Sequence, residues 1–334
     1  MNAMEMYDTI YMFASHECRE IFGDDGSLAR EAFRRSTAGD MLPGLWLELP
    51  LLGRPRFDLH ITYGKEAICD GAPFPQQAAD GHGALLNWYA EQKTSSIAGL
   101  ALGYDAGEGH IQRPAAVHAL VEGAENSGEP DVEGLFSHLG RSDAAPRLAQ
   151  FLRRVPREWR LWYFGIFTGR PDAPVRADFF VDSMKGAYAK DTSLLAAHLS
   201  QMGIAASSDT MRIAEAILRS PFELELQFDV LPDGSAGPTV GLSAGFHMES
   251  IADARRRFRD GDAARLLEFA EKQGLADGRW RCAERAFFAR GKKERGGMRV
   301  VACAPKFVKF RIRDGAALDA KIYLAAWAAD TWNE

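Results

Sequence analysis

The feature that most limits what this chain can fold into is a pattern that occurs five times, in which a helical stretch is followed by two β-like runs around a short turn. In the runs 56–64 and 175–182, apolar and polar side chains alternate with the period of a strand that has one buried face. Pro114 makes the second pair the least regular, because proline fits poorly in a central strand. We expect ten strands in five hairpins, at residues 44–52 and 56–64, 96–105 and 112–121, 159–169 and 175–182, 222–230 and 239–248, and 306–312 and 318–326.

Helical spacing of apolar residues separates these hairpins, and the expected helices span residues 84–93, 145–155, 193–203, 210–220 and 262–274. A ten-stranded antiparallel sheet with helices on one face most easily closes on itself, because closure removes its free edges. We therefore predict an α+β fold: a ten-stranded antiparallel β-barrel built from five αββα-type repeats, with helices on the outside and a solvent-accessible lumen. One domain, 1–334, is expected, with a helical lead-in over residues 1–40 and the barrel over residues 41–327.

Charge and hydropathy argue against several classes of partner. Forty basic and 46 acidic side chains give a net charge of −6, the wrong sign for a general binder of nucleic acid or anionic membranes. The longest apolar run, 322–329, has eight residues, whereas a bilayer-spanning helix needs roughly 20. Glu5 and Asp8 stand where a secretory signal needs basic residues, so we expect a cytoplasmic protein. Neither a zinc site nor a disulfide framework is expected from the scattered cysteines, Cys18, Cys69, Cys282 and Cys303.

The second face of each hairpin is unusually polar for a barrel interior. If the apolar faces pack against the helices, these polar side chains point into the lumen, where burial is costly unless they are paired, hydrated or bound to a ligand. An open sheet with its polar faces turned to solvent would produce the same alternation. Basic residues recur in several hairpins, and Arg and Lys donors are what a diphosphate needs. The predicted inward set is Arg56, Asp58, His60, Thr62, Arg176, Asp178, Asp182, Glu223, Glu225, Gln227, Ser243, His247, Lys309, Arg311, Asp319, Lys321 and Tyr323.

In repeat count and order, the chain resembles the ABBA-type aromatic prenyltransferases, from about residue 40 to residue 327. The stretch GRPRFDLHITYG, 53–64, resembles a strand of the family's first hairpin and puts Asp58 at the family's acidic position. Lys321 and Tyr323 match the family's Lys-x-Tyr motif, in which the lysine binds diphosphate oxygens. The earlier copy of that motif has Arg176 but carries Asp178 in place of the tyrosine.

The resemblance implies an enzyme that transfers a prenyl group from dimethylallyl or geranyl diphosphate to a small aromatic acceptor such as an indole or phenol. A carboxylate near the acceptor would take up the proton lost by the ring, and we expect this base to be Asp58, with Glu223 or Glu225 next. His60 or His247 could serve instead. The resemblance implies that no cofactor is required, although Mg²⁺ could assist the reaction, and we assign no metal ligands. We expect the protein to be a monomer or a homodimer. The diphosphate-binding residues would be Arg56, Arg176, Lys309, Arg311, Lys321 and Tyr323, and the substrate-lining residues Tyr163, Trp162, Phe180, His247 and Glu225.

Two other readings stay open at the level of sequence. A non-catalytic barrel could bind a hydrophobic or diphosphate-tailed ligand in the same lumen. A sheet-based scaffold protein would have no lumen at all. Neither the aromatic acceptor nor the length of the prenyl chain can be read from the spacing of residues.

Overall fold

Each expected hairpin corresponds to two neighbouring antiparallel strands in the computed structural model, which describes residues 3–23, 26–37, 44–64, 82–91, 97–105, 114–121, 132–168, 173–294 and 297–331. Pro114 lies just before its strand, so it takes no place in the hydrogen-bond ladder. The strands are β1 (Gly44–Pro50), β2 (Asp58–Gly64), β3 (Ile97–Tyr104), β4 (Ala116–Val121), β5 (Arg160–Ile166), β6 (Val175–Phe180), β7 (Glu223–Val230), β8 (Ala236–Gly245), β9 (Phe288–Glu294), β10 (Gly297–Arg313) and β11 (Ala316–Thr331).

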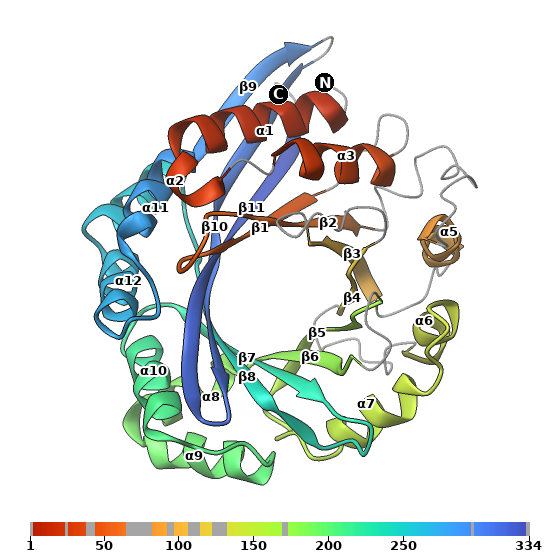
Figure 1. The fold of residues 1–334 in the computed structure, drawn as a ribbon, viewed down its shortest axis with the longest axis vertical. Helices are drawn as coiled ribbons and strands as arrows, with labels where there is room; N and C mark the ends of the chain where they lie inside the picture. The colour runs from red at the N-terminus through yellow and green to blue at the C-terminus, as the bar shows by residue number, and fades with distance from the viewer. Residues whose placement is uncertain are drawn as a thin grey trace.

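Ten of these strands close into a ring. The order runs from β11 through β1 to β8 and on to β10, and β10 pairs again with β11. Every strand pair is antiparallel, and at the seam Glu48 of β1 lies opposite Tyr323 of β11 on one side and Asp58 of β2 on the other. The prediction of a closed ten-stranded antiparallel barrel is therefore confirmed (Figure 1).

Helices surround the barrel on its outer side (Figure 1). The five helices expected from the spacing of apolar residues are present within a few residues of their predicted ends, and α1 to α3 form the described part of the helical lead-in. The helices are α1 (Ala3–Glu17), α2 (Arg19–Phe22), α3 (Gly26–Ser36), α5 (His82–Glu91), α6 (Val132–His138), α7 (Ala144–Leu152), α8 (Asp182–Lys190), α9 (Thr192–Gln201), α10 (Ser208–Leu218), α11 (Ile251–Arg259) and α12 (Asp262–Lys272), with a 3-10 helix, η3 (Gly278–Ala286).

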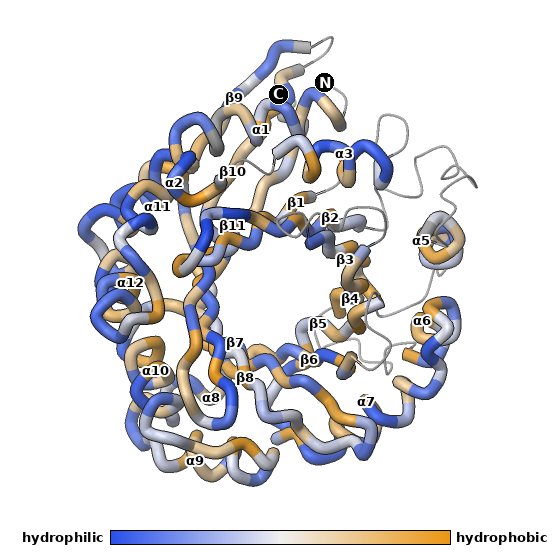
Figure 2. The backbone as a smooth tube through the Cα atoms, viewed as in Figure 1, coloured by the Kyte–Doolittle hydropathy of each residue, from blue (hydrophilic) through white to orange (hydrophobic). Residues whose placement is uncertain are grey.

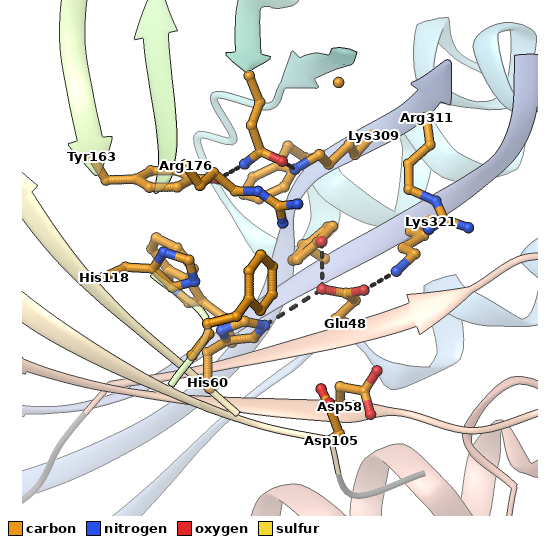
Figure 3. A pocket seen from close by; sticks show the side chains of 18 of the residues that line it. Glu48, Asp58, His60, Asp105, His118, Tyr163, Arg176, Lys309, Arg311 and Lys321 are labelled. Carbon is orange, nitrogen blue, oxygen red and sulfur yellow. Dashed lines mark hydrogen bonds and ion pairs between the residues drawn. The ribbon is translucent and has the colours of Figure 1, made fainter. Parts of the chain in front are cut away.

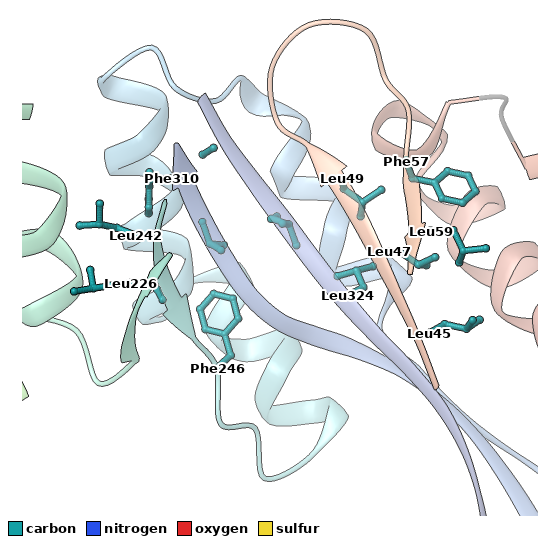
Figure 4. Close-up of a cluster of buried hydrophobic side chains, with 14 of the residues drawn as sticks. Leu45, Leu47, Leu49, Phe57, Leu59, Leu226, Leu242, Phe246, Phe310 and Leu324 are labelled. Carbon is teal, nitrogen blue, oxygen red and sulfur yellow. The ribbon is translucent and has the colours of Figure 1, made fainter. Parts of the chain in front are cut away.

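The hydrophobic core lies between the strands and the helices. Leu45, Leu47 and Leu49 of β1 are at most 3% exposed and belong to the same cluster as Leu226 and Leu242 on the opposite side of the seam (Figure 4). On the helix side, α11 and α12 are hydrophilic outward and more hydrophobic toward the barrel (Figure 2). Because this layer takes the apolar face of every strand, the other face must form the interior of the barrel.

The structure departs from expectation in β9 and in the length of β10 and β11. Lys292 and Lys293 lie on β9, a strand that is not among the ten expected ones and that pairs with β10 alone. β10 and β11 extend beyond the ring as a paired ribbon, and the apolar run 322–329 pairs with β1 over residues 322–326 and continues into this ribbon. No helix among the described residues is long and apolar enough to cross a membrane.

Three cysteines, Cys18, Cys282 and Cys303, are buried free thiols. The fourth, Cys69, lies outside the described residues, as do residues 170–172 between two of the expected strands and residues 112–113 of the expected fourth strand.

Candidate functional site

A cavity of about 240 Å³ occupies the interior of the barrel, and every barrel strand or its end contributes to the wall. The wall is mixed, with cations, carboxylates and aromatic rings facing the same space (Figure 3). Its residues are Trp46, Glu48, Arg56, Asp58, His60, Gly103, Tyr104, Asp105, Ala116, His118, Leu120, Tyr163, Phe167, Arg176, Gln227, Asp229, Thr239, Gly241, Phe307, Lys309, Arg311, Lys321 and Tyr323.

The alternation of polar residues predicted much of this wall correctly. The structure brings together nine of the fourteen residues assigned to the site, although they come from five different strands or their ends. These nine are Arg56, Asp58, His60, Tyr163, Arg176, Lys309, Arg311, Lys321 and Tyr323.

The other five predicted residues do not line this cavity. Glu223 pairs with His247 (Oε1 to Nε2, 2.5 Å), whose side chain is 75% exposed because β8 ends two residues before it. Trp162 packs on Phe180, with ring centroids 4.9 Å apart, and a register shift in β5 between Leu161 and Tyr163 takes Trp162 out of the alternation. Neither Glu223 nor His247 can therefore act on a ligand in the cavity from these positions.

Glu225, the fifth, is 2% exposed and lies opposite Ser243 in the β7–β8 register. Burial first, and then the neighbouring Asp178, raise the pKa of Glu225 well above its ordinary value. It forms part of the polar interior beyond the cavity wall, and it does not face the cavity.

Glu48, which the sequence analysis did not single out, is a cavity carboxylate with three side-chain partners. The Tyr323 hydroxyl donates to its Oε2 at 2.5 Å, His60 Nε2 lies 3.5 Å from the same oxygen, and Lys321 pairs with Oε1 (Figure 3). Burial alone would raise the pKa of Glu48, but Lys321 and His60 outweigh it and hold that pKa well below the ordinary value. The signal was present in β1, where Trp46 and Glu48 alternate with three buried leucines.

Two cations of the cavity wall, Arg176 of β6 and Arg311 of β10, are paired with carboxylates. Arg176 donates to Asp229 at 3.0 Å, and its guanidinium lies 4.5 Å above the Phe167 ring. Arg311 donates through Nε to Asp319 at 2.8 Å. These pairs lower the cost of holding charge inside the barrel, and they leave cationic groups facing the cavity.

Lys309 belongs to a different network, built around Gln227. The Gln227 amide oxygen accepts from Lys309, while its nitrogen donates to Asp178 Oδ2 at 3.2 Å and contacts the Tyr163 hydroxyl. All four side chains are at most 8% exposed. Burial is the largest cause that lowers the pKa of Lys309 to about 7, and burial likewise raises the pKa of Asp178 to about 7.

Asp58 lies on the opposite wall beside Asp105 (Figure 3). Burial, followed by the negative charges of Glu48 and Asp105, raises the pKa of Asp58 to about 6. A carboxylate with such a pKa is ionised at neutral pH and is a stronger base than an ordinary aspartate.

His118 is a second cavity residue that the sequence analysis missed. It is 8% exposed, its ring centroid lies 5.4 Å from that of Tyr163, and its Nδ1 has no hydrogen-bond partner among the described residues. Burial, followed by the neighbouring His60, lowers the pKa of His118, so the ring is neutral. A lone histidine in the apolar run AVHALV gave only a weak signal.

Aromatic rings cover the rest of the wall near Glu48. Phe307 and Tyr323 stack with centroids 4.2 Å apart, and Trp46 meets Phe307 edge-on at 6.2 Å. No group of three or more His, Cys, Asp or Glu side chains in the described part of the chain is arranged to hold a metal ion.

Comparison of the sequence with models of known protein families and with curated proteins gives no match.

Proposed function

We propose that this protein is an aromatic prenyltransferase of the ABBA type, with five αββα repeats, and that it joins a prenyl diphosphate to an aromatic acceptor inside the barrel. The observation that supports this best is the composition of the cavity wall. Five cations, Arg56, Arg176, Lys309, Arg311 and Lys321, face the same closed space as Trp46, Phe307 and Tyr323. An allylic diphosphate needs both kinds of surface.

In the proposed reaction, the bond between the first prenyl carbon and the diphosphate oxygen breaks, and its electron pair leaves with the diphosphate. Lys309, Arg176 and Arg311 would stabilise the charge on that leaving group. The allylic cation would lie against the faces of Tyr323 and Phe307, away from bulk water. A carbon or heteroatom of the acceptor then forms the new bond and loses a proton.

Asp58 is the residue that we propose takes this proton. It lines the cavity on the wall opposite Lys309 and Arg176, where an acceptor would lie beyond the prenyl group. Its pKa of about 6 leaves it ionised at pH 7 and makes it the better base, because Glu48 is held at a low pKa by Lys321 and His60. Turnover should therefore decline as the pH falls below about 6.

The first test is calorimetric titration of the full chain with thiolo-diphosphate analogues of dimethylallyl and then geranyl alcohol, each with and without Mg²⁺. We expect micromolar binding of at least one analogue, and the stronger binder identifies the length of the prenyl chain. Arg176→Gln should weaken binding, whereas Lys292→Ala, an exposed lysine on β9 outside the barrel ring, should not. Failure of both analogues to bind the folded protein would contradict the proposal.

A non-catalytic binding barrel is the alternative, and the ion pairs Arg176–Asp229 and Lys321–Glu48 favour it, because they neutralise two cations that an enzyme would use. Asp58→Asn separates the two functions. An enzyme should lose turnover by about two orders of magnitude or more while keeping its affinity for the analogue. A protein that only binds would show no turnover of any aromatic acceptor before or after the substitution.

A further inference from the structure

The cations on the β6, β10 and β11 wall differ in what neutralises them. Three of them form an ion pair with a carboxylate: Arg176 with Asp229, Arg311 with Asp319, and Lys321 with Glu48. Lys309 forms no such ion pair among the described residues, where its one hydrogen bond goes to the neutral amide oxygen of Gln227. An anion that reaches Lys309 displaces no carboxylate, whereas at the other three it must compete with one.

The surroundings of Lys309 also oppose its charge. Lys321 lies directly opposite it in the β10–β11 register, and like charges at opposed positions repel. Lys309 itself is 5% exposed, so water does little to offset that repulsion. A buried ammonium in this position gains more than its neighbours from a bound anion.

Asp178 lies on the other side of Gln227 and is 1% exposed. Its Oδ2 accepts from the Gln227 amide, and its Oδ1 is buried without a hydrogen-bond partner in the described part of the chain. A charged carboxylate with one unpartnered oxygen is costly, and a protonated one is less so. Asp178 can therefore hold a proton at little cost.

We propose that, near pH 7, an anion binds in this cavity together with one proton that the buried pair of Lys309 and Asp178 takes up, and that Lys309 is the first ligand of that anion. At this pH and without the anion, the two groups share a single proton, so together they carry no net charge, whichever of them holds it. A bound anion favours a charged Lys309 and opposes a charged Asp178. The complex then holds a charged lysine and a protonated aspartate, which is one proton more.

Titration of both groups near neutrality supports this count, since burial brings the pKa of Lys309 down to about 7 and that of Asp178 up to about 7. As the pH rises through this range, Lys309 loses positive charge and Asp178 gains negative charge, so both changes weaken anion binding. The other titratable or charged groups that interact with this pair come from β1, β4, β5, β6, β7 and β11, and are Glu48, His118, Tyr163, Arg176, Glu225 and Lys321.

The inference rests on the proposed function only in taking a diphosphate as the natural anion, and its test uses two probes, inorganic sulfate and inorganic diphosphate. Each is titrated into the full chain in two buffers of different protonation enthalpy, which gives the number of protons taken up. Sulfate stays fully ionised at these pH values, so any proton taken up with it belongs to the protein. We expect about one proton per anion at pH 7, and above about pH 7.5 an affinity that falls by about tenfold or more per pH unit, because both groups are then losing their protons.

Lys309→Arg is the matched variant, because arginine stays charged and needs no proton. Combined with Asp178→Asn, which removes the other titrating group, it should bind the anions with little dependence on pH. Lys309→Met with Asp178→Asn, in case arginine does not fit, should bind them weakly without proton uptake. Sulfate binding to the unmodified chain without proton uptake, or uptake that persists in a folded double variant of Lys309 and Asp178, would overturn the inference. Sulfate bound with a proton while no diphosphate binds would contradict the proposed function alone, and a cavity that binds neither anion would contradict both.

Discussion

Small residues on the inner face of the barrel decide which large side chains can enter the cavity. Gly103 lies so close to His60 that a Cβ there would stand 3.0 Å from the ring nitrogen Nδ1. At Gly165 of β5, a Cβ would collide with the Val117 carbonyl oxygen and with the His118 ring, and would stand 2.8 Å from the His118 Cα. His60 and His118 thus occupy space that neighbouring strands leave open.

Gly165→Ala tests this at the level of one methyl group. The methyl group would meet backbone atoms of β4, which cannot move aside as a flexible side chain can, so we expect the free energy of unfolding to fall by about 1–3 kcal/mol. Urea denaturation followed by circular dichroism measures it. Gly186→Ala is the control, because nothing lies within 4 Å of a Cβ in this exposed part of α8, and there alanine should leave stability equal or raise it by up to about 1 kcal/mol. Equal stability of the two variants would show that β4 gives way easily.

The sequence predicted individual site residues well where a polar residue alternates with apolar ones in a clear hairpin. Arg176, Lys309 and Lys321 were found in this way. The same rule applied to β1 would have found Glu48, but a single carboxylate in a leucine-rich run looks like the solvent face of a strand until its partners are known. Those partners are distant in the chain, as Lys321 is 273 residues away, and no local pattern encodes that contact.

At the scale of elements, hairpins and helices were predictable because each has a local period, and what joins one element to another was not. β9 was missed because its residues, FARGKKE, are mostly charged and lack an apolar alternation. The strand forms because β10 offers it a free edge beyond the ring. Trp162 and Phe180 were misplaced for a similar reason, because the register shift in β5 follows from pairing with β6 and leaves no mark on spacing.

One contact between elements, from the start of α10 to the β10–β11 turn, can be tested by mutation. Ser207 is the N-cap, its Oγ accepts from the Thr210 amide at 3.1 Å, and it donates to the carbonyl of Gly315 in the β10–β11 turn at 2.5 Å. Ser207→Ala removes a helix cap and a tie to the barrel together, so we expect a loss of about 1–2 kcal/mol in the free energy of unfolding.

Ser250→Ala is the matched control, because Ser250 caps α11 through the Asp253 amide at 3.1 Å and is exposed. Its loss should be smaller, about 0.5–1 kcal/mol. Thermal unfolding of the two variants, side by side, gives the comparison. If Ser250→Ala costs as much as Ser207→Ala, the contact with the β10–β11 turn contributes nothing to stability.

For the molecule as a whole, closure of the barrel creates the site, since it brings the two ends of the sheet together at the seam of β1, β10 and β11. The seam supplies Glu48, Lys309, Lys321 and Tyr323, so the most polar part of the cavity exists only in the closed ring. Closure also buries acidic and basic side chains that water solvates in the unfolded chain, and this burial lowers the free energy of unfolding of the whole barrel.

Asp178 makes this cost measurable. Because its pKa is raised from 3.8 to about 7, the folded protein keeps a proton that the unfolded chain has already released between these two values. The unfolded state therefore binds fewer protons in this window, and the contribution of Asp178 to stability, complete below pH 3.8, is lost as the pH rises toward 7. Asparagine stays neutral and avoids that loss.

We expect Asp178→Asn to gain stability relative to the unmodified chain by about 1 kcal/mol or more as the pH rises from about 4.5 to about 7.5. Denaturant unfolding at the two pH values measures the difference. Asp314→Asn, an exposed residue in the β10–β11 turn with a positive φ that asparagine also tolerates, should show no such trend. A stability difference for Asp178→Asn that is the same at both pH values would mean that Asp178 is charged throughout, with Lys309 as its permanent counterion, and the buried pair would then have no proton to exchange with a ligand.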